Sequence, residues 1–364
     1  MEEQAKRNPL PDVLRGFATI LVIWGHCIQE GNGKAYTDGM LYFSDPVYKF
    51  IYSFHMPLFA LIAGYFAYKS LARVNLKEWG AARTVKYFAG KLLIYIIPIF
   101  AFSVFDYIRT YAAYVIKYGG VTVWDMIILF FQMFFANAWF LWGIALSFTC
   151  AFLIHLIFKD NVLICLAGVL AMFLIPDTAG ILFLGSFHAC KFIAAFYLAA
   201  YAFAGICKSP RVENMLNRIL QREALSCLIA GLLFALLLIF YRDNVFVYVS
   251  GQCIFGGNVL HLAILYAYRF VVGTTGSLFF LLLFKLLMDK TGCSFTLLRK
   301  VGTNSLGMYM IQGYVIILGF NRLTDNLSYS LIRTFLEAVI VTAICYLLTA
   351  LIARVPYLRK IVGK

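Results

Sequence analysis

Long apolar runs separated by short polar segments cover nearly the whole chain. A helix needs about 20 residues to cross the hydrocarbon core of a bilayer, and ten runs approach that length. Because only helices and closed barrels cross a bilayer, and the runs do not alternate as barrel strands do, the pattern predicts an all-α integral membrane protein. We expect spans at approximately residues 13–29, 46–68, 88–116, 138–158, 161–176, 188–206, 224–241, 262–288, 303–321 and 331–353.

Three stretches are less regular than the others. The fifth expected span is short, and the eighth is interrupted by Arg269, Gly273 and Gly276, which predicts a kink or a break. Residues 121–137 are apolar but short, which is typical of a re-entrant or interfacial segment. No stretch is polar enough to form a separate soluble domain, so we expect one membrane domain over residues 1–364.

Composition agrees with the hydrophobic pattern. The chain is 63% hydrophobic and 13% charged, whereas soluble domains are about 45–50% apolar and about 25% charged. The first apolar run contains Arg15 and His26 and is not followed by a small-residue cleavage site, so we expect it to remain as a membrane helix. The nine cysteines form no close pair, which argues against a disulfide framework.

The distribution of positive charge predicts the topology. If the N-terminus is cytoplasmic and ten spans alternate, about two thirds of the 31 Lys and Arg residues fall in cytoplasmic segments, as the positive-inside rule requires. We therefore expect both termini in the cytoplasm and a multi-pass protein of the cell (plasma or inner) membrane. The same rule explains the net charge of +14, so we do not expect a nucleic-acid partner.

The first expected span carries two ionisable residues, which are rare inside a membrane and often functional. Arg15 and His26 are 11 residues apart, so they lie on one face of a helix, roughly 16 Å apart along its axis. Asp12 could pair with Arg15, and Glu30 could orient the His26 ring. Arg suits phosphate, and a deeper His suits a general base on a hydroxyl. The structural alternative is an Arg15 that reaches lipid phosphates and a His26 that only forms a hydrogen bond.

The second expected span contains His55 beside Pro57. Proline removes one backbone hydrogen bond, which creates a polar position in the span. A plain proline kink with a hydrogen-bonded histidine is an equally good interpretation. The remaining histidines lie near span ends and need no function, and none of the five shows the spacing of metal ligands, so we expect no metal.

Four short motifs, in the expected order, resemble those of the acyltransferase type-three family of membrane acyltransferases, with its fucose 4-O-acetylase-like branch as the nearest match. They are residues 12–18 with His26, residues 54–59 with Gly64 and Tyr65, residues 139–141, and residues 302–306 with Tyr309. The sequence departs from the family pattern at Ala63, at Gln312, and before the third span, where Lys86 and Lys91 replace an arginine cluster.

The resemblance implies ten helices, transfer of an acyl group, usually acetyl from acetyl-CoA, to an extracytoplasmic or lipid-linked glycan, and an essential Arg and His in the first span. On this basis we expect three groups of site residues. They are a catalytic group of His26, Glu30 and His55, a group of Arg15, Lys86 and Lys91 for the acyl-CoA, and a group of Trp139, Asn304 and Tyr309 for the acceptor.

Two other functions stay open beside the enzyme. A transporter or flippase for a lipid-linked sugar would show inverted repeats and charged residues spread over several spans, and a receptor or scaffold would need no chemistry. The concentration of ionisable residues in the first span favours the enzyme. Acetyl is the expected acyl group, and succinyl is the alternative. The pattern does not indicate an oligomeric state.

Overall fold

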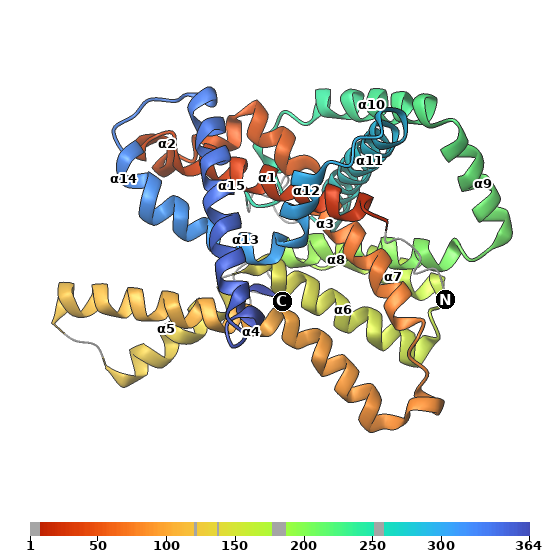
Figure 1. Ribbon diagram of the computed structural model, residues 1–364, viewed down its shortest axis with the longest axis horizontal. Helices are drawn as coiled ribbons and strands as arrows, with labels where there is room; N and C mark the ends of the chain where they lie inside the picture. Colours follow the sequence, from red (N-terminus) through yellow and green to blue (C-terminus); the bar gives the residue numbers. More distant parts are fainter. Residues whose placement is uncertain (1–7, 120–121, 137, 177–186, 251–257) are drawn as a thin grey trace. The chain divides into compact units, whose positions relative to one another are not determined.

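A computed structural model describes residues 8–119, 122–136, 138–176, 187–250 and 258–364. These residues form helices joined by short connections, and no strand occurs among them (Figure 1). The fold is therefore all-α, as predicted.

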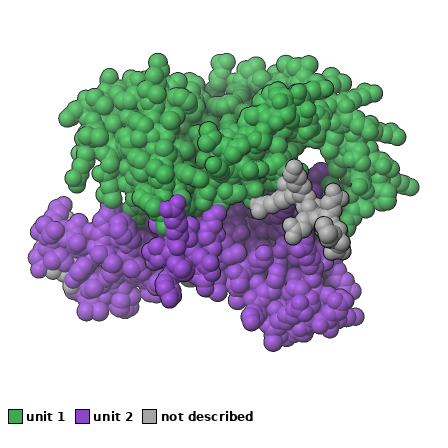
Figure 2. Space-filling model, in the orientation of Figure 1, with its two compact units in different colours: residues 1–62, 207–252, 267–351 green, residues 63–206, 253–266, 352–364 purple. Residues whose placement is uncertain are grey.

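The chain forms two compact units, each made from separate stretches of sequence (Figure 2). The first unit consists of residues 1–62, 207–252 and 267–351. Its elements are α1 (Leu10–Glu30), α2 (Lys34–Asp38), η1 (Leu41–Ser44), the first part of α3 (Pro46–Leu71), α9 (Pro210–Gln221), α10 (Glu223–Phe240), η3 (Asn244–Phe246), most of α11 (Val259–Thr291), α12 (Thr296–Thr303), α13 (Ser305–Tyr314), the π-helix η4 (Val315–Phe320), α14 (Asn321–Thr324) and most of α15 (Leu331–Arg354).

The second unit consists of residues 63–206, 253–266 and 352–364. Its helices include α4 (Leu76–Tyr118), α5 (Val123–Ala136), α6 (Trp139–Phe158), α7 (Val162–Leu174), α8 (Phe187–Ile206) and η5 (Arg359–Val362). Helix α8 packs against both α6 and α7, and α5 packs against α4 (Figure 1). The sequence left open whether residues 121–137 form a re-entrant or an interfacial segment. Residues 123–136 of this stretch are helical.

Among the described residues, seven helices are long and apolar enough to cross a membrane, namely α3, α4, α6, α8, α10, α11 and α15. Three further expected spans coincide with helices that do not meet that standard. Helix α1 is 21 residues long but carries polar side chains, α7 has only 13 residues, and the segment from α13 to α14 contains a π-helix. The seven helices support a multi-pass membrane protein, while the count of ten and the side of each terminus stay predictions.

The break expected as one alternative in the eighth span was wrong, because α11 is continuous from Val259 to Thr291. The hydroxyl of Ser277 donates a hydrogen bond of 2.7 Å to the carbonyl of Gly273 within the helix. Gly276 instead allows close packing against α3, because a methyl group there would lie 2.8 Å from Cβ of Phe54. Buried Arg269 donates to the carbonyls of Phe246 and Val245, so its charge is accommodated without breaking α11.

Candidate active site

Two glycines allow α1 and α12 to cross with their backbones in contact. A methyl group at Gly16 would lie 1.9 Å from the carbonyl oxygen of Leu298, and one at Gly302 would lie 1.8 Å from that of Asp12. No larger residue fits so close an approach unless the helices move apart. The motifs around Arg15 and Gly302, distant in the sequence, therefore meet in space within the first unit.

Arg15 lies at this crossing and is held by Asp12. Its Nη1 donates to Asp12 Oδ1 at 3.3 Å, with 28% of the Arg15 side chain and 6% of the Asp12 side chain exposed. The predicted pair is confirmed. The buried carboxylate orients a guanidinium that is still accessible from outside the bundle. Helix α12 also carries Arg299 and Lys300, both exposed.

His26 lies three turns further along α1, where this helix packs against α3. A methyl group at the neighbouring Gly25 would lie 2.9 Å from the Tyr52 ring. The His26 ring is half-buried, and it makes no hydrogen bond to any residue that the structure describes. A histidine that is partly accessible and not committed to a protein partner is free to accept a proton from a substrate.

His55 approaches the same part of α1 from α3. Its ring packs edge-on against Tyr52, with 4.8 Å between ring centroids, and the Tyr52 ring in turn lies against Gly25, the neighbour of His26. Nδ1 of His55 is 2.6 Å from the carbonyl of Ile51. Because a carbonyl only accepts, Nδ1 carries the proton, and Nε2 is the acceptor in the neutral ring. Helix α3 continues through Pro57, which cannot donate a backbone hydrogen bond.

Glu30 is bound away from His26. Its carboxylate accepts hydrogen bonds from Gln29 Nε2 at 3.0 Å and from Asn321 Nδ2 at 3.1 Å. Spacing along α1 brings Glu30 near His26, but no hydrogen bond between them occurs in the described chain. As the last residue of α1, Glu30 turns toward the first residue of α14, which directly follows the π-helix η4.

Two predicted acceptor residues lie on the elements that pack against α1. Asn304 joins α12 to α13, and its Nδ2 donates to the carbonyl of Lys300 at 2.8 Å. Tyr309 is half-buried in α13. One further polar residue of α13, Gln312, is 6% exposed, and its Oε1 has no hydrogen-bond partner within the described residues. In the sequence, Gln312 stood out as a departure from the family motif, and no role was assigned to it.

Three predicted residues belong to the second unit. Lys86 is exposed on α4, and Lys91 lies over the Tyr87 ring at 5.6 Å from its centroid. Trp139 is the first residue of α6, and its carbonyl accepts a hydrogen bond of 3.4 Å from Cys190 Sγ. The structure thus places Arg15, His26, Glu30, His55, Asn304 and Tyr309 in the first unit, and it places Lys86, Lys91 and Trp139 in the second. In the described residues no three His, Cys, Asp or Glu side chains are grouped closely enough to hold a metal ion.

Comparisons with known proteins show which family the sequence resembles. The profile of the acyltransferase domain family matches residues 8–354, so it extends over both units. The nodulation protein NolL of Sinorhizobium fredii is 27% identical over 214 residues, which are 59% of this chain and 52% of that protein. The match therefore spans about half the length of this relative. No solved structure matches the chain. Because the family profile covers nearly all of the sequence, this chain belongs to the acyltransferase domain family.

Proposed function

We propose that the protein is a membrane O-acyltransferase of the cell membrane. It takes an acyl group from acyl-CoA on the cytoplasmic side and transfers it to a hydroxyl of an extracytoplasmic or lipid-linked glycan. Acetyl is the expected group. The observation that carries the proposal is the arrangement on α1, where the accessible guanidinium of Arg15 and the uncommitted ring of His26 are three turns apart.

The donor site is proposed around Arg15. A guanidinium binds phosphate through two parallel hydrogen bonds, and Asp12 fixes its orientation from the buried side. An extended pantetheine chain directed along α1 would carry the thioester toward His26. Lys86 and Lys91 are proposed as additional contacts for the donor phosphates.

The proposed chemistry is direct transfer in a ternary complex. His26 removes the proton from the acceptor hydroxyl while the hydroxyl oxygen attacks the thioester carbon. The tetrahedral intermediate then collapses, the carbon–sulfur bond breaks, and the proton passes from the imidazolium to the departing sulfur. The products are an ester and free coenzyme A. Such a base contributes about 10² to 10⁴-fold in rate.

The other site residues have supporting roles in this proposal. His55 is proposed to stabilise the developing oxyanion or to guide the acceptor. Glu30 is proposed to act on His26 indirectly, through the polar end of α1 that it shares with Asn321. Trp139, Asn304 and Tyr309 are proposed as acceptor contacts.

Detergent-purified protein supplied with radiolabelled acetyl-CoA and glycan acceptors tests the proposal. The protein should bind acetyl-CoA and, when an acceptor is present, release coenzyme A and labelled ester in equal amounts. Binding of sugar without any acetyl-CoA binding or turnover would contradict it and favour the transporter. Succinyl-CoA, tested in parallel, identifies the acyl group.

A further inference from the structure

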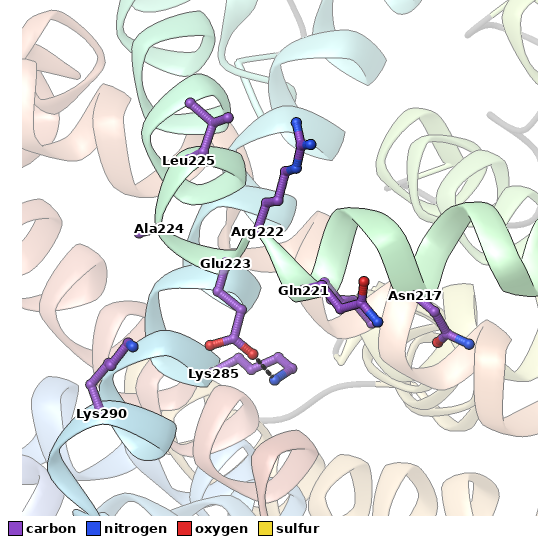
Figure 3. Close-up of a pocket in the computed structure, with 9 residues that line it drawn as sticks. Asn217, Gln221, Arg222, Glu223, Ala224, Leu225, Lys285 and Lys290 are labelled. Carbon is purple, nitrogen blue, oxygen red and sulfur yellow. Dashed lines mark hydrogen bonds and ion pairs between the residues drawn. The ribbon is translucent and has the colours of Figure 1, made fainter.

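A cavity of about 770 Å³ opens in the first unit at the junction of α9 and α10. Figure 3 shows Arg222 and Glu223 at this junction, with Lys285 and Lys290 contributed by α11. No residue of the proposed active site lines this cavity. Three cations and one carboxylate in the wall leave it positively charged.

Ion pairs within the protein do not neutralise all of this positive charge. Glu223 forms an ion pair with Lys285 (Figure 3), and Lys285 also pairs with Asp289. Arg222 extends away from the Glu223–Lys285 pair, and both Arg222 and Lys290 are exposed. Neither of them forms an ion pair with a residue in the described part of the chain. Two cations, Arg222 and Lys290, can therefore attract an anion to the cavity.

Helix α9 indicates the depth at which this cavity lies. Its apolar residues recur at the spacing of one helix face, from Val212 through Met215 to Ile219, while Arg211 and Arg218 lie among its polar residues. Met215 is 54% exposed and Ile219 42% exposed. Basic residues beside an uncovered apolar face are typical of a helix in the membrane interface, at the level of the lipid head groups.

A row of exposed leucines extends from the cavity along α10. Leu225 lines the cavity and is 49% exposed, and Leu228, Leu232 and Leu236 continue along α10 with more than half of each side chain exposed. Acyl chains can lie against this row, while Arg222 and Lys290 contribute positive charge that attracts a phosphate to the cavity. We propose that the cavity is a binding site for an anionic phospholipid, with its head group attracted by the cations that line the cavity and its chains along α10.

The test uses the full-length protein in mild detergent and measures lipid binding by native mass spectrometry. The probes are a phosphatidylglycerol and a phosphatidylcholine with the same acyl chains. The wild type should bind phosphatidylglycerol at least tenfold more tightly than phosphatidylcholine. The double substitution Arg222→Gln and Lys290→Gln should weaken phosphatidylglycerol binding about 30-fold, the combined effect of two cations at a lipid surface.

The matched control removes the same charge elsewhere on the protein. Arg211→Gln with Lys360→Gln changes two exposed cations that do not line the cavity, and binding should change less than threefold. Arg222→Lys with Lys290→Arg should retain binding. Thermal unfolding confirms that each variant is folded. If the Gln pair does not fold, Lys290→Gln alone should still weaken binding about fivefold, which corresponds to one cation.

Three results would overturn the proposal. One is equal affinity for the two lipids, and another is an equal loss in the cavity variant and its control, which would indicate a general surface charge effect. The third concerns a soluble anion. Coenzyme A and inorganic phosphate, added as competitors, should not displace phosphatidylglycerol. Displacement that depends on Arg222 would assign the cavity to a free phosphate compound instead.

Discussion

The substitution Gly16→Ala tests whether the backbones of α1 and α12 are in contact where the two helices cross. The added methyl group would lie 1.9 Å from the Leu298 carbonyl oxygen, about 1.5 Å short of the 3.4 Å at which ordinary contact begins. The obstacle is helix backbone, so the helices must separate. Forcing a methyl group into a packed contact costs about 1–3 kcal/mol. Because Arg15 adjoins Gly16, the separation should also move the proposed donor site.

Gly313→Ala is the matched control. Gly313 lies in α13 of the same unit, and apart from its chain neighbours and the backbone of its own helix, a methyl group there would meet no atom within 4 Å. Replacing glycine by alanine inside a helix stabilises it by up to about 1 kcal/mol, so this variant should be as stable as the wild type or more stable. The assays are thermal unfolding in detergent and acetyl-CoA binding. Gly16→Ala should lower both stability and affinity. Equal stability of the two alanine variants would refute the close crossing.

Much of the fold could be predicted from hydrophobic runs alone. Residues 46–68 and 138–158 were expected as spans, and the helices are Pro46–Leu71 and Trp139–Phe158. Hydropathy succeeds here because a spanning helix satisfies its own backbone, whatever its neighbours are. The pair of Asp12 and Arg15 could be predicted for the same reason, since it depends only on helix geometry.

The sequence could not predict features that depend on contacts between helices. Glycine suggested a break in α11, but Gly276 is instead a place of close packing. Helical spacing placed Glu30 beside His26, whereas its carboxylate binds Asn321, almost 300 positions later, because α14 approaches the end of α1. Hydropathy could not predict the contact between Gly16 and α12, because it does not show which helix packs against a glycine.

Three further predictions follow from the site, a loop and the topology. Arg15→Lys should weaken acetyl-CoA binding roughly tenfold in a direct binding assay, because Lys lacks the planar fork, and unchanged affinity would remove Arg15 from the donor site. Desolvation of its hydroxyl group and a 2.7 Å hydrogen bond to Asp45 raise the pKa of Tyr329 to about 12, while 48% of the residue is exposed. The stability that this tyrosine contributes is present below about pH 10 and lost as the pH rises toward 12. Tyr329→Phe should therefore lower the melting temperature at pH 8 but not near pH 12. An equal loss of melting temperature at both pH values would contradict this. Cysteines introduced at Lys34 and Lys77 in a Cys-less background should be labelled from opposite sides of the membrane, and labelling from one side would contradict the ten-span topology.

The central claim is that His26 performs base catalysis without contributing to donor affinity. The most direct measurement compares acetyl-CoA binding and single-turnover acyl transfer in the wild type, His26→Ala and His26→Gln. Both variants should bind acetyl-CoA within about twofold of the wild type, while transfer falls by about 10² to 10⁴-fold. No acyl-protein adduct should accumulate when the acceptor is omitted. Wild-type turnover in His26→Ala, or an acyl adduct trapped without acceptor, would contradict the proposed mechanism.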